Sequence, residues 1–281
     1  MIDLHMHSTE SDGQYKPSEL VLMAKKKNLS YIALTDHDTI AGLYECELYA
    51  RENGIRFLRG IEISVKGNRE LHILGYGVDP ESQSLLMLCD EFVKQRGLRA
   101  QRILDYLDAK GVHITLEQVM RHSSSGSVGR PHVAQALVEV RAVTTVREAF
   151  ELYLGTPEFD KIERPKPEPG KGISAILNSG GIAILAHPAL LKIDNATLEK
   201  LVYQLVVDAG LGGIECYYST HTKEQTEYYL SLAKKFGLVV SGGSDFHGEK
   251  VKANIALGTG CDGMLSITED MVSRELLDMA K

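Results

Sequence analysis

Short runs of apolar residues, each followed by a polar or acidic tip, recur along the whole chain. They lie at residues 1–7, 31–38, 55–63, 71–78, 181–188, 212–218 and 238–247. Apolarity within each run is continuous rather than alternating, which is typical of strands buried on both faces of a parallel sheet. Between several of them, apolar residues recur at helical spacing, at 17–28, 40–53 and 222–236. This strand–helix alternation predicts an α/β fold.

The alternation breaks between residues 80 and 170. That part of the chain has the apolar spacing of consecutive helices, at 83–110, 115–122, 131–140 and 145–154. A proline-rich segment, ERPKPEPGKG at 163–172, follows and is expected to be a stiff connector back to the main body. We therefore predict two domains: an α/β body from 1–80 and 166–281, and a small helical insert, 81–165, over the active site.

Composition narrows the class of protein. The 281 residues are 43% hydrophobic and 25% charged, a balance that supports a substantial core. The net charge of −7 disfavours a nucleic-acid binder that relies on bulk basicity, unless bound cations supply local positive charge. Four scattered cysteines without a CxxC pair argue against a disulfide framework and a thiolate zinc site. With neither a signal peptide nor a membrane segment evident, we expect a cytoplasmic enzyme without an obligate protein partner.

Histidines gather at or just after the expected strand ends, namely His5, His7, His37, His72, His187, His221 and His247. Acidic residues accompany them: Asp12, Asp36, Asp38, Glu62 and Asp245. Because the carboxyl ends of barrel strands converge on one face, residues remote in sequence would meet there. In His5-x-His7 and Asp245-x-His247 both side chains point to the same side of a strand. A single histidine at a strand end is more often structural, but so many together predict a centre for zinc, manganese or iron.

These segments carry a resemblance to a known family across nearly the full length. They are D-L-H-M-H with S-D-G at 11–13, T-D-H-D-T at 35–39, G-I-E-I at 60–63, H-I-L-G-Y-G at 72–77, A-H-P at 186–188 and G-S-D-F-H at 243–247. The chain resembles the PHP (polymerase and histidinol phosphatase) superfamily of metal-dependent phosphoesterases. The resemblance implies a distorted (β/α)7 barrel that carries the inserted helical domain.

Within that superfamily the chain is similar to the stand-alone nucleotide phosphoesterases with a helical insert, which the H-I-L-G-Y-G segment and G-R-P-H at 129–132 support. The implied activity is hydrolysis of nucleotide phosphate monoesters, of the AMP or 3′,5′-bisphosphonucleoside type, by a metal-bound hydroxide. The alternative is a 5′→3′ exonuclease on short RNA or DNA oligonucleotides. A hypothesis of another class is a non-catalytic metal-binding regulatory module.

The resemblance also implies a trinuclear metal site. By matching positions, His5, His7, Glu62 and Asp245 would hold the first ion. A second would share Glu62 and be completed by His72 and His187, and a third would be held by Asp12, His37 and His247. Three divalent ions are implied, Mn²⁺ first, with Fe²⁺ or Zn²⁺ as alternatives. Glu62, as the bridging ligand, is counted among the catalytic residues.

Three further residues are candidates for contacts with a small nucleotide or a short oligonucleotide. Arg130 is predicted to clamp the substrate phosphate because a guanidinium binds two phosphate oxygens at once. It could instead precede a helix beginning at Pro131 and pair with a neighbouring acid. His132 belongs to the same motif. His221 could bind phosphate or protonate the leaving alkoxide, or be an exposed loop residue. Asp36 and Asp38 are interpreted as acceptors for metal-bound imidazoles.

Overall fold

The computed structural model describes residues 1–68, 70–122, 129–162 and 165–281, and the chain divides into two compact units. The first, here called the barrel unit, comprises Met1–Cys89 and Lys166–Lys281. The second, the insert unit, comprises Asp90–Pro165. Helix α3 (Gln83–Ala109) begins in one unit and ends in the other.

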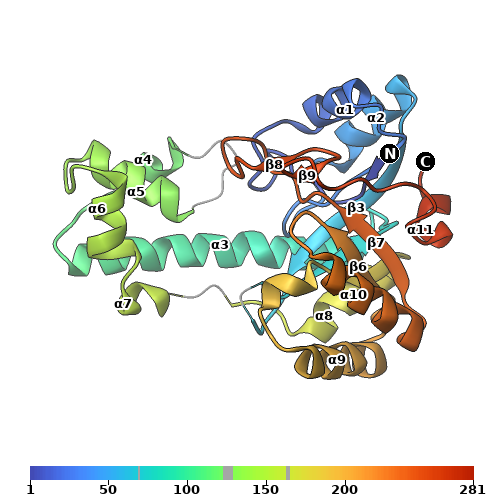
Figure 1. The fold of residues 1–281 in the computed structure, drawn as a ribbon. Coiled ribbons are helices and arrows are strands. Elements are labelled where there is room, and N and C mark those ends of the chain that lie inside the picture. Colours follow the sequence, from blue (N-terminus) through green and yellow to red (C-terminus); the bar gives the residue numbers. More distant parts are fainter. Residues whose placement is uncertain (69, 123–128, 163–164) are drawn as a thin grey trace. The chain divides into compact units, whose positions relative to one another are not determined.

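Seven strands of the barrel unit form one sheet in chain order (Figure 1). They are β1 (Ile2–Asp3), β2 (Tyr31–Leu34), β3 (Arg56–Ser64), β4 (His72–Tyr76), β5 (Ile182–Leu185), β6 (Gly213–Tyr218) and β7 (Val239–Gly243). The first and last strands also meet, since Leu4 donates its N–H to Gly242 at 3.3 Å. Further along, Asp245 donates to the carbonyl of His5 at 2.8 Å. The sheet is therefore a nearly closed barrel, which confirms the predicted fold class.

Strand β4 runs against its neighbours, whereas the apolar runs predicted a parallel sheet. It pairs antiparallel with β3, with Leu74 opposite Glu62, and antiparallel with β5. The remaining pairs are parallel. Only residues 65–71 separate β3 from β4, and a parallel connection needs a crossover of about a dozen residues or more. The short connection therefore forces a hairpin and distorts the barrel.

Helices of the barrel unit connect most of its strands, and the last of these helices follows the final strand. They are α1 (Pro17–Lys26), α2 (Leu43–Asn53), α8 (Pro169–Asn178), α9 (Asn195–Gln204), α10 (Lys223–Phe236) and α11 (Arg274–Asp278), with the short turns η2 (Pro188–Leu191) and η3 (Leu205–Ala209). Sequence caps define their ends: in α10, Thr222 and Gln225 form a reciprocal capping box, and Gly237 closes the helix with φ +64°. A two-stranded hairpin, β8 (Ile255–Ala256) and β9 (Gly260–Cys261), follows β7.

The expected proline-rich connector is shorter than the sequence suggested. Helix α8 begins at Pro169, inside the predicted connector 163–172, because proline is well tolerated at the first helical position. Residues 165–168 belong to no helix or strand, and residues 163–164 lie outside the described part of the chain.

The barrel is filled by apolar side chains from its strands. Residues such as Ile2, Leu58, Leu74 and Ile184 are fully buried in one cluster. Tyr76 belongs to the same cluster, and its hydroxyl donates to the carbonyl of Leu4 at 2.6 Å, so its one polar atom is satisfied. A rigid core of this kind fixes the strand ends that carry the candidate site.

The insert unit has a hydrophobic core of its own. Its elements are the later part of α3, α4 (Leu116–Met120), α5 (Arg130–Glu139), α6 (Val146–Ala149), η1 (Phe150–Leu154) and α7 (Pro157–Asp160). Ile103 and Leu107 of α3 pack with Val133, Leu137 and Phe159. Among the helices that the structure describes, none combines the length and apolarity needed to cross a membrane.

Candidate metal centre

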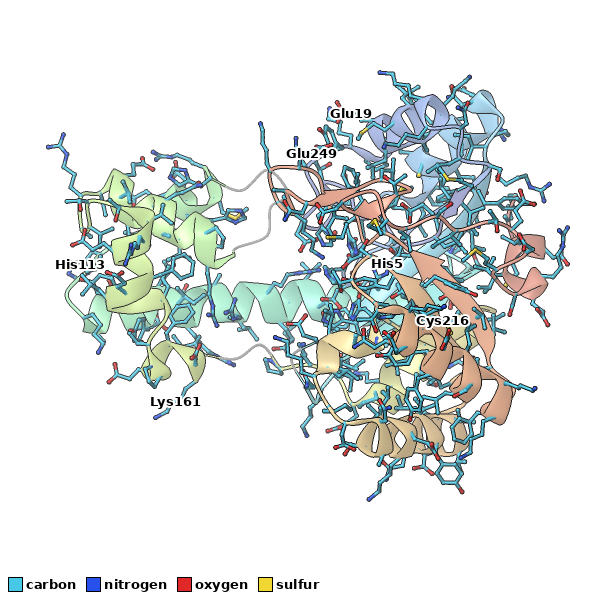
Figure 2. All side chains as sticks on the ribbon, in the orientation of Figure 1. His5, Glu19, His113, Lys161, Cys216 and Glu249 are labelled. Carbon is cyan, nitrogen blue, oxygen red and sulfur yellow. The ribbon has the colours of Figure 1, made fainter. Side chains whose placement is uncertain are left out.

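The nine predicted metal ligands lie at one rim of the barrel. Eight come from the carboxyl ends of strands or the loops after them, and His72 is the first residue of β4. Because β4 is antiparallel, its first residue lies opposite Ser64 at the end of β3, and therefore at the same rim. Figure 2 shows His5 among the strands of the barrel unit.

Two glycines allow the loops at this rim to approach each other closely. A Cβ on Gly243 would lie 2.3 Å from the backbone nitrogen of His5, and one on Gly13 would lie 2.2 Å from the carbonyl oxygen of His7. Real Cβ atoms do not approach backbone atoms so closely. The glycines of the S-D-G and G-S-D-F-H segments are thus explained by packing against the His5–His7 segment.

Carboxylates at strand ends hold the neighbouring loops through serines. Asp36 accepts the Ser8 N–H at 2.7 Å and the hydroxyls of Ser8 and Ser11 at 2.6 Å each. Asp3 accepts both the N–H and the hydroxyl of Ser244, at 2.8 and 2.6 Å. Asp36, interpreted from the sequence as an acceptor for an imidazole, therefore fixes the loop that carries Asp12.

Asp38 makes the same type of contact to the next strand. It accepts the Ser64 N–H at 2.8 Å and lies 3.3 Å from the Ser64 hydroxyl. Its φ of +57° is in the left-handed region, which aspartate tolerates better than most residues. This contact joins the turn after β2 to the end of β3, and so lies beside both His37 and Glu62.

Glu62 lies at the middle of the cluster and is fully buried. Its Oε1 is 2.8 Å from His187 Nε2 and 3.0 Å from His72 Nδ1. Its Oε2 is 3.1 Å from His37 Nδ1, 3.2 Å from His7 Nε2 and 3.4 Å from His5 Nε2. One carboxylate thus lies within reach of five imidazoles.

Two further carboxylates flank this group. Asp245 Oδ1 lies 3.2 Å from both His7 Nε2 and His247 Nδ1. Asp12 Oδ1 lies 3.3 Å from His247 Nε2, and Asp12 Oδ2 lies 4.0 Å from His37 Nε2. The cluster therefore extends from Glu62 through His7 and His247 to Asp12.

The donor atoms fall into groups compact enough for single ions. Three sets have ligand atoms within 4.8 Å of one another: His5, His7, Glu62 and Asp245; His7, Asp12, His37 and His247; and His37, Glu62 and His72. Both nitrogens of His7, Nδ1 of His37 and of His187, and Asp245 Oδ1 are buried without a hydrogen-bond partner among the described residues. Buried polar atoms normally have partners, so these orphaned atoms fit ligation of metal ions.

The charged groups of the cluster shift one another's pKa values. Burial by itself would lower the pKa of His7, but the carboxylates of Asp245 and Glu62 outweigh it and raise that pKa to about 9. Burial would raise the pKa of Glu62, yet the surrounding histidines hold it well below its usual range. Burial lowers the pKa of His37 to about 3. Glu62 is therefore ionised at neutral pH, and positive charge is favoured beside it.

Glu215, an acidic residue inside an apolar run, cannot be assigned to ligand binding or to structural support from the sequence alone. This buried residue of β6 lies 2.9 Å from His5 Nδ1 through Oε1, and its Oε2 accepts the backbone N–H of His187 at 2.7 Å. His187 has φ +27°, a strained backbone conformation that this hydrogen bond helps to hold. The signal was the acidic residue within the apolar run at 212–218, since a buried carboxylate requires partners.

The three predicted substrate residues lie in different surroundings. His221 is in the barrel unit, and its Nδ1 donates to the carbonyl of Cys216 at 2.9 Å while Nε2 is buried without a partner among the described residues. Arg130 and His132 are in the insert unit, in the first turn of α5. Arg130 lies 3.1 Å from Asp160 Oδ1 and over the ring of Phe159. His132 Nδ1 accepts the Gly129 N–H at 3.1 Å.

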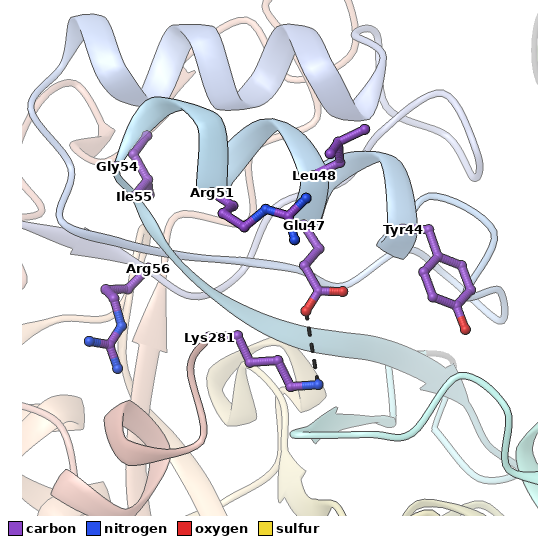
Figure 3. A pocket seen from close by; sticks show the side chains of 8 residues that line it. All are labelled: Tyr44, Glu47, Leu48, Arg51, Gly54, Ile55, Arg56 and Lys281. Atoms are coloured by element: carbon purple, nitrogen blue, oxygen red, sulfur yellow. Dashed lines mark ion pairs between the residues drawn. The ribbon is translucent and has the colours of Figure 1, made fainter.

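A pocket of about 540 Å³ lies elsewhere in the barrel unit (Figure 3). Arg56, Arg51 and Lys281 line it with Glu47 and Tyr44. Arg56 begins β3, whereas Glu62 is near the other end of that strand. The pocket is therefore separate from the histidine cluster.

Comparison with known proteins identifies the family of this chain. The model of the PHP domain matches residues 3–153. A 5′-3′ exoribonuclease of Haemophilus influenzae is 35% identical over 246 residues, which cover 87% of this chain and 89% of the relative. The chain belongs to the PHP family. A 3′,5′-nucleoside bisphosphate phosphatase of Chromobacterium violaceum is 34% identical over 250 residues, covering 88% of this chain and 87% of that PHP protein.

A solved structure extends the likeness to the whole PHP fold. It is a putative metal-dependent phosphoesterase from Bifidobacterium adolescentis, 29% identical, with a TM-score of 0.77 over 100% of this chain and 96% of its own. The predicted family and the predicted enzyme class, a metal-dependent phosphoesterase, are thereby confirmed. The PHP barrel holds a His/Glu/Asp cluster able to bind metal ions.

Proposed function

We propose that the chain is a phosphomonoesterase that acts on small nucleotides, of the AMP or 3′,5′-bisphosphonucleoside type. The observation that carries the proposal is the buried cluster with orphaned histidine nitrogens around the ionised Glu62. The Chromobacterium relative is named for such a substrate class and matches nearly the full length of both chains. A non-catalytic regulatory module is disfavoured, because none of the nine ligand positions has lost its donor group.

We assign the ligands by combining the three compact sets with the resemblance. His5, His7, Glu62 and Asp245 would hold one ion; Asp12, His37 and His247 would hold another. The third would be held by Glu62 with His72 and His187, and His37 also reaches this group. Manganese is the proposed metal, with iron or zinc compatible with the same donors. When bound, these ions would neutralise charge on the phosphate and acidify water at neutral pH.

The chain's own residues would orient the metal ligands and exclude bulk water from the site. Glu62 is ionised at neutral pH, so its carboxylate would be available to both of the ions that it is proposed to hold. Burial of the cluster keeps bulk water from weakening the electrostatic interactions with the phosphate. Glu215 holds His5 with Nδ1 toward itself, which leaves Nε2 for an ion.

His221 is proposed to accept a hydrogen bond from a water or a sugar hydroxyl. Burial lowers its pKa, so the imidazole is neutral at pH 7. Because Nδ1 carries the proton that it donates to Cys216, Nε2 presents a lone pair. A neutral imidazole can accept a proton, but it has no positive charge with which to bind phosphate. Arg130 is proposed to bind the phosphate, which requires it to exchange its contact with Asp160 for the substrate.

The test is phosphate release with manganese-loaded protein. The panel holds AMP, 3′,5′-bisphosphoadenosine, histidinol phosphate and a 5′-phosphorylated RNA pentamer. We expect one of the two mononucleotides to be the best substrate and Glu62→Gln to abolish release while the protein stays folded. Release from none of the four, or full activity of Glu62→Gln with metals bound, would contradict the proposal.

A second candidate is a 5′→3′ exonuclease, favoured by the Haemophilus relative at nearly the same identity. Faster release of mononucleotides from the RNA pentamer than of phosphate from AMP would select it. Of the basic residues in the insert, Arg99 donates to the carbonyl of Ile162 at 3.0 Å and is thus held within its own unit. An oligonucleotide would need a basic face, and the residues that could form one at helical spacing in α3 are Lys94, Arg96, Arg99 and Arg102. The contact with Ile162 weakens the case for Arg99 as part of such a face.

A further inference from the structure

A lysine outside all the sequence motifs lies beside the candidate metal centre. Lys252, in the loop after β7, places Nζ 2.7 Å from Asp245 Oδ2. The same oxygen accepts the hydroxyl of Tyr218 at 2.7 Å. The other oxygen, Oδ1, faces His7 and His247 at 3.2 Å each. The ammonium group therefore contacts one oxygen of a carboxylate whose other oxygen lies within the histidine cluster.

The loop that carries Lys252 is held in place. Lys250 donates its backbone N–H to Gln14 Oε1 at 2.9 Å, and Tyr15 donates its hydroxyl to Glu249 at 2.7 Å. The Lys252 N–H bonds to the Gly248 carbonyl at 2.9 Å. These contacts tie the loop to residues 14 and 15, next to Asp12, so that Lys252 is directed at the rim by a fixed backbone.

Of the two donors on Asp245 Oδ2, only the lysine is open to solvent. The Lys252 side chain is 35% exposed, whereas that of Asp245 is 4% exposed and Tyr218 is buried. An ammonium group has three donors, and one oxygen of Asp245 engages one of them. The lysine can therefore reach a ligand at the rim while it stays paired with Asp245.

We propose that Lys252 binds the phosphate of the substrate, with Asp245 holding its ammonium in place. A phosphate dianion at the same rim offers a second charged partner to the remaining N–H donors of the ammonium, through a charge-assisted hydrogen bond. The proposal rests on the proposed function, because it requires the phosphate to bind at this cluster.

The test is calorimetric titration of inorganic phosphate into manganese-saturated protein. Lys252→Met keeps most of the unbranched side chain and removes the charge, and Lys252→Arg restores the charge. We expect Lys252→Met to weaken phosphate binding roughly tenfold or more, and Lys252→Arg to recover most of the affinity. Lys250→Met is the matched control, since Lys250 is an exposed residue of the same loop; it should bind phosphate like the unmodified protein.

Tyr218→Phe separates direct binding from an effect through Asp245. It removes the other donor to Asp245 Oδ2, so it should leave phosphate affinity within about threefold if the lysine itself binds the ligand. Equal losses in Tyr218→Phe and Lys252→Met, or no difference between Lys252→Met and Lys250→Met, would overturn the proposal. Because the readout is the heat of phosphate binding, it stands apart from the substrate panel: inactivity toward nucleotides would refute the proposed function alone.

Discussion

Glu215 Oε1 lies 2.9 Å from Nδ1 of His5, and both side chains are fully buried. This contact fixes the ring of His5 so that Nε2 points toward Glu62 and Asp245. A carboxylate that orients an imidazole also makes it a better ligand, since it stabilises the tautomer that presents the correct nitrogen.

We predict that Glu215→Gln weakens manganese binding roughly 10- to 100-fold. The amide retains an oxygen for His5 but its NH₂ group cannot accept the His187 N–H. Equilibrium dialysis with metal analysis would measure the effect. Glu227→Gln, on an exposed part of α10, is the matched control and should bind manganese normally. Normal affinity in Glu215→Gln would show that His5 needs no orientation by this residue.

The metal-free protein should lose stability as the pH rises above neutrality. The pKa of His7 is raised to about 9, so its charged form is favoured by folding. Such a histidine stabilises the folded state fully at pH values below its pKa in the unfolded chain, about 6.5. That contribution is lost as the pH rises through about 9. Urea denaturation of chelator-treated protein at pH 6.5 and 9.5 would measure the difference. His7→Gln should flatten this pH dependence, and equal slopes in both proteins would contradict the assignment.

Gly243→Ala should destabilise the barrel by about 1–3 kcal/mol, because the added methyl would overlap the backbone of His5. Gly97→Ala is the matched control: nothing lies within 4 Å of the Cβ it would add in α3. There the substitution should stabilise by about 0.8–1 kcal/mol, as alanine is the better helix former. Denaturation midpoints of both variants would measure these changes. An unchanged midpoint in Gly243→Ala would mean that the segments after β1 and at the end of β7 do not pack this closely.

Arg130→Met should lower kcat/KM roughly 10- to 100-fold, as expected for a lost charged hydrogen bond to the substrate. Its present partner, Asp160, supplies the control. If Arg130 acts only through that ion pair, Asp160→Asn would lower kcat/KM equally. If it binds phosphate, Asp160→Asn should leave kcat/KM unchanged or raise it. Steady-state kinetics on the best substrate of the panel would distinguish the two.

The sequence predicted the strand positions and the family well, and for a physical reason. Buried strands give continuous apolar runs, and residues at i and i+2 on a strand end face one side. His5, His7, Asp245 and His247 can therefore be grouped from the amino-acid pattern alone. The structure brings all nine predicted ligands to one rim, while their binding of ions stays a prediction.

Other features depend on contacts that no local pattern encodes. An apolar run carries no information on strand direction, so the antiparallel β4 was missed. Lys252 looks like an ordinary loop lysine until Asp245 is placed beside it. The partners of Asp36 likewise lie 25 and 28 residues away, on a loop whose course depends on the close approach of Gly13 to His7.

The closure between β1 and β7 has a consequence for biosynthesis. Asp3 and Ser244 are 241 residues apart in the chain and hydrogen-bond directly, and the candidate ligands extend from His5 to His247. Synthesis proceeds from the amino terminus, so a nascent chain holds its first two histidines long before the last ligands leave the ribosome. The proposed ion site that joins His5 and His7 to Asp245 can therefore form only after residue 245 has been translated, and products truncated before that point would expose the two histidines without a closed barrel around them.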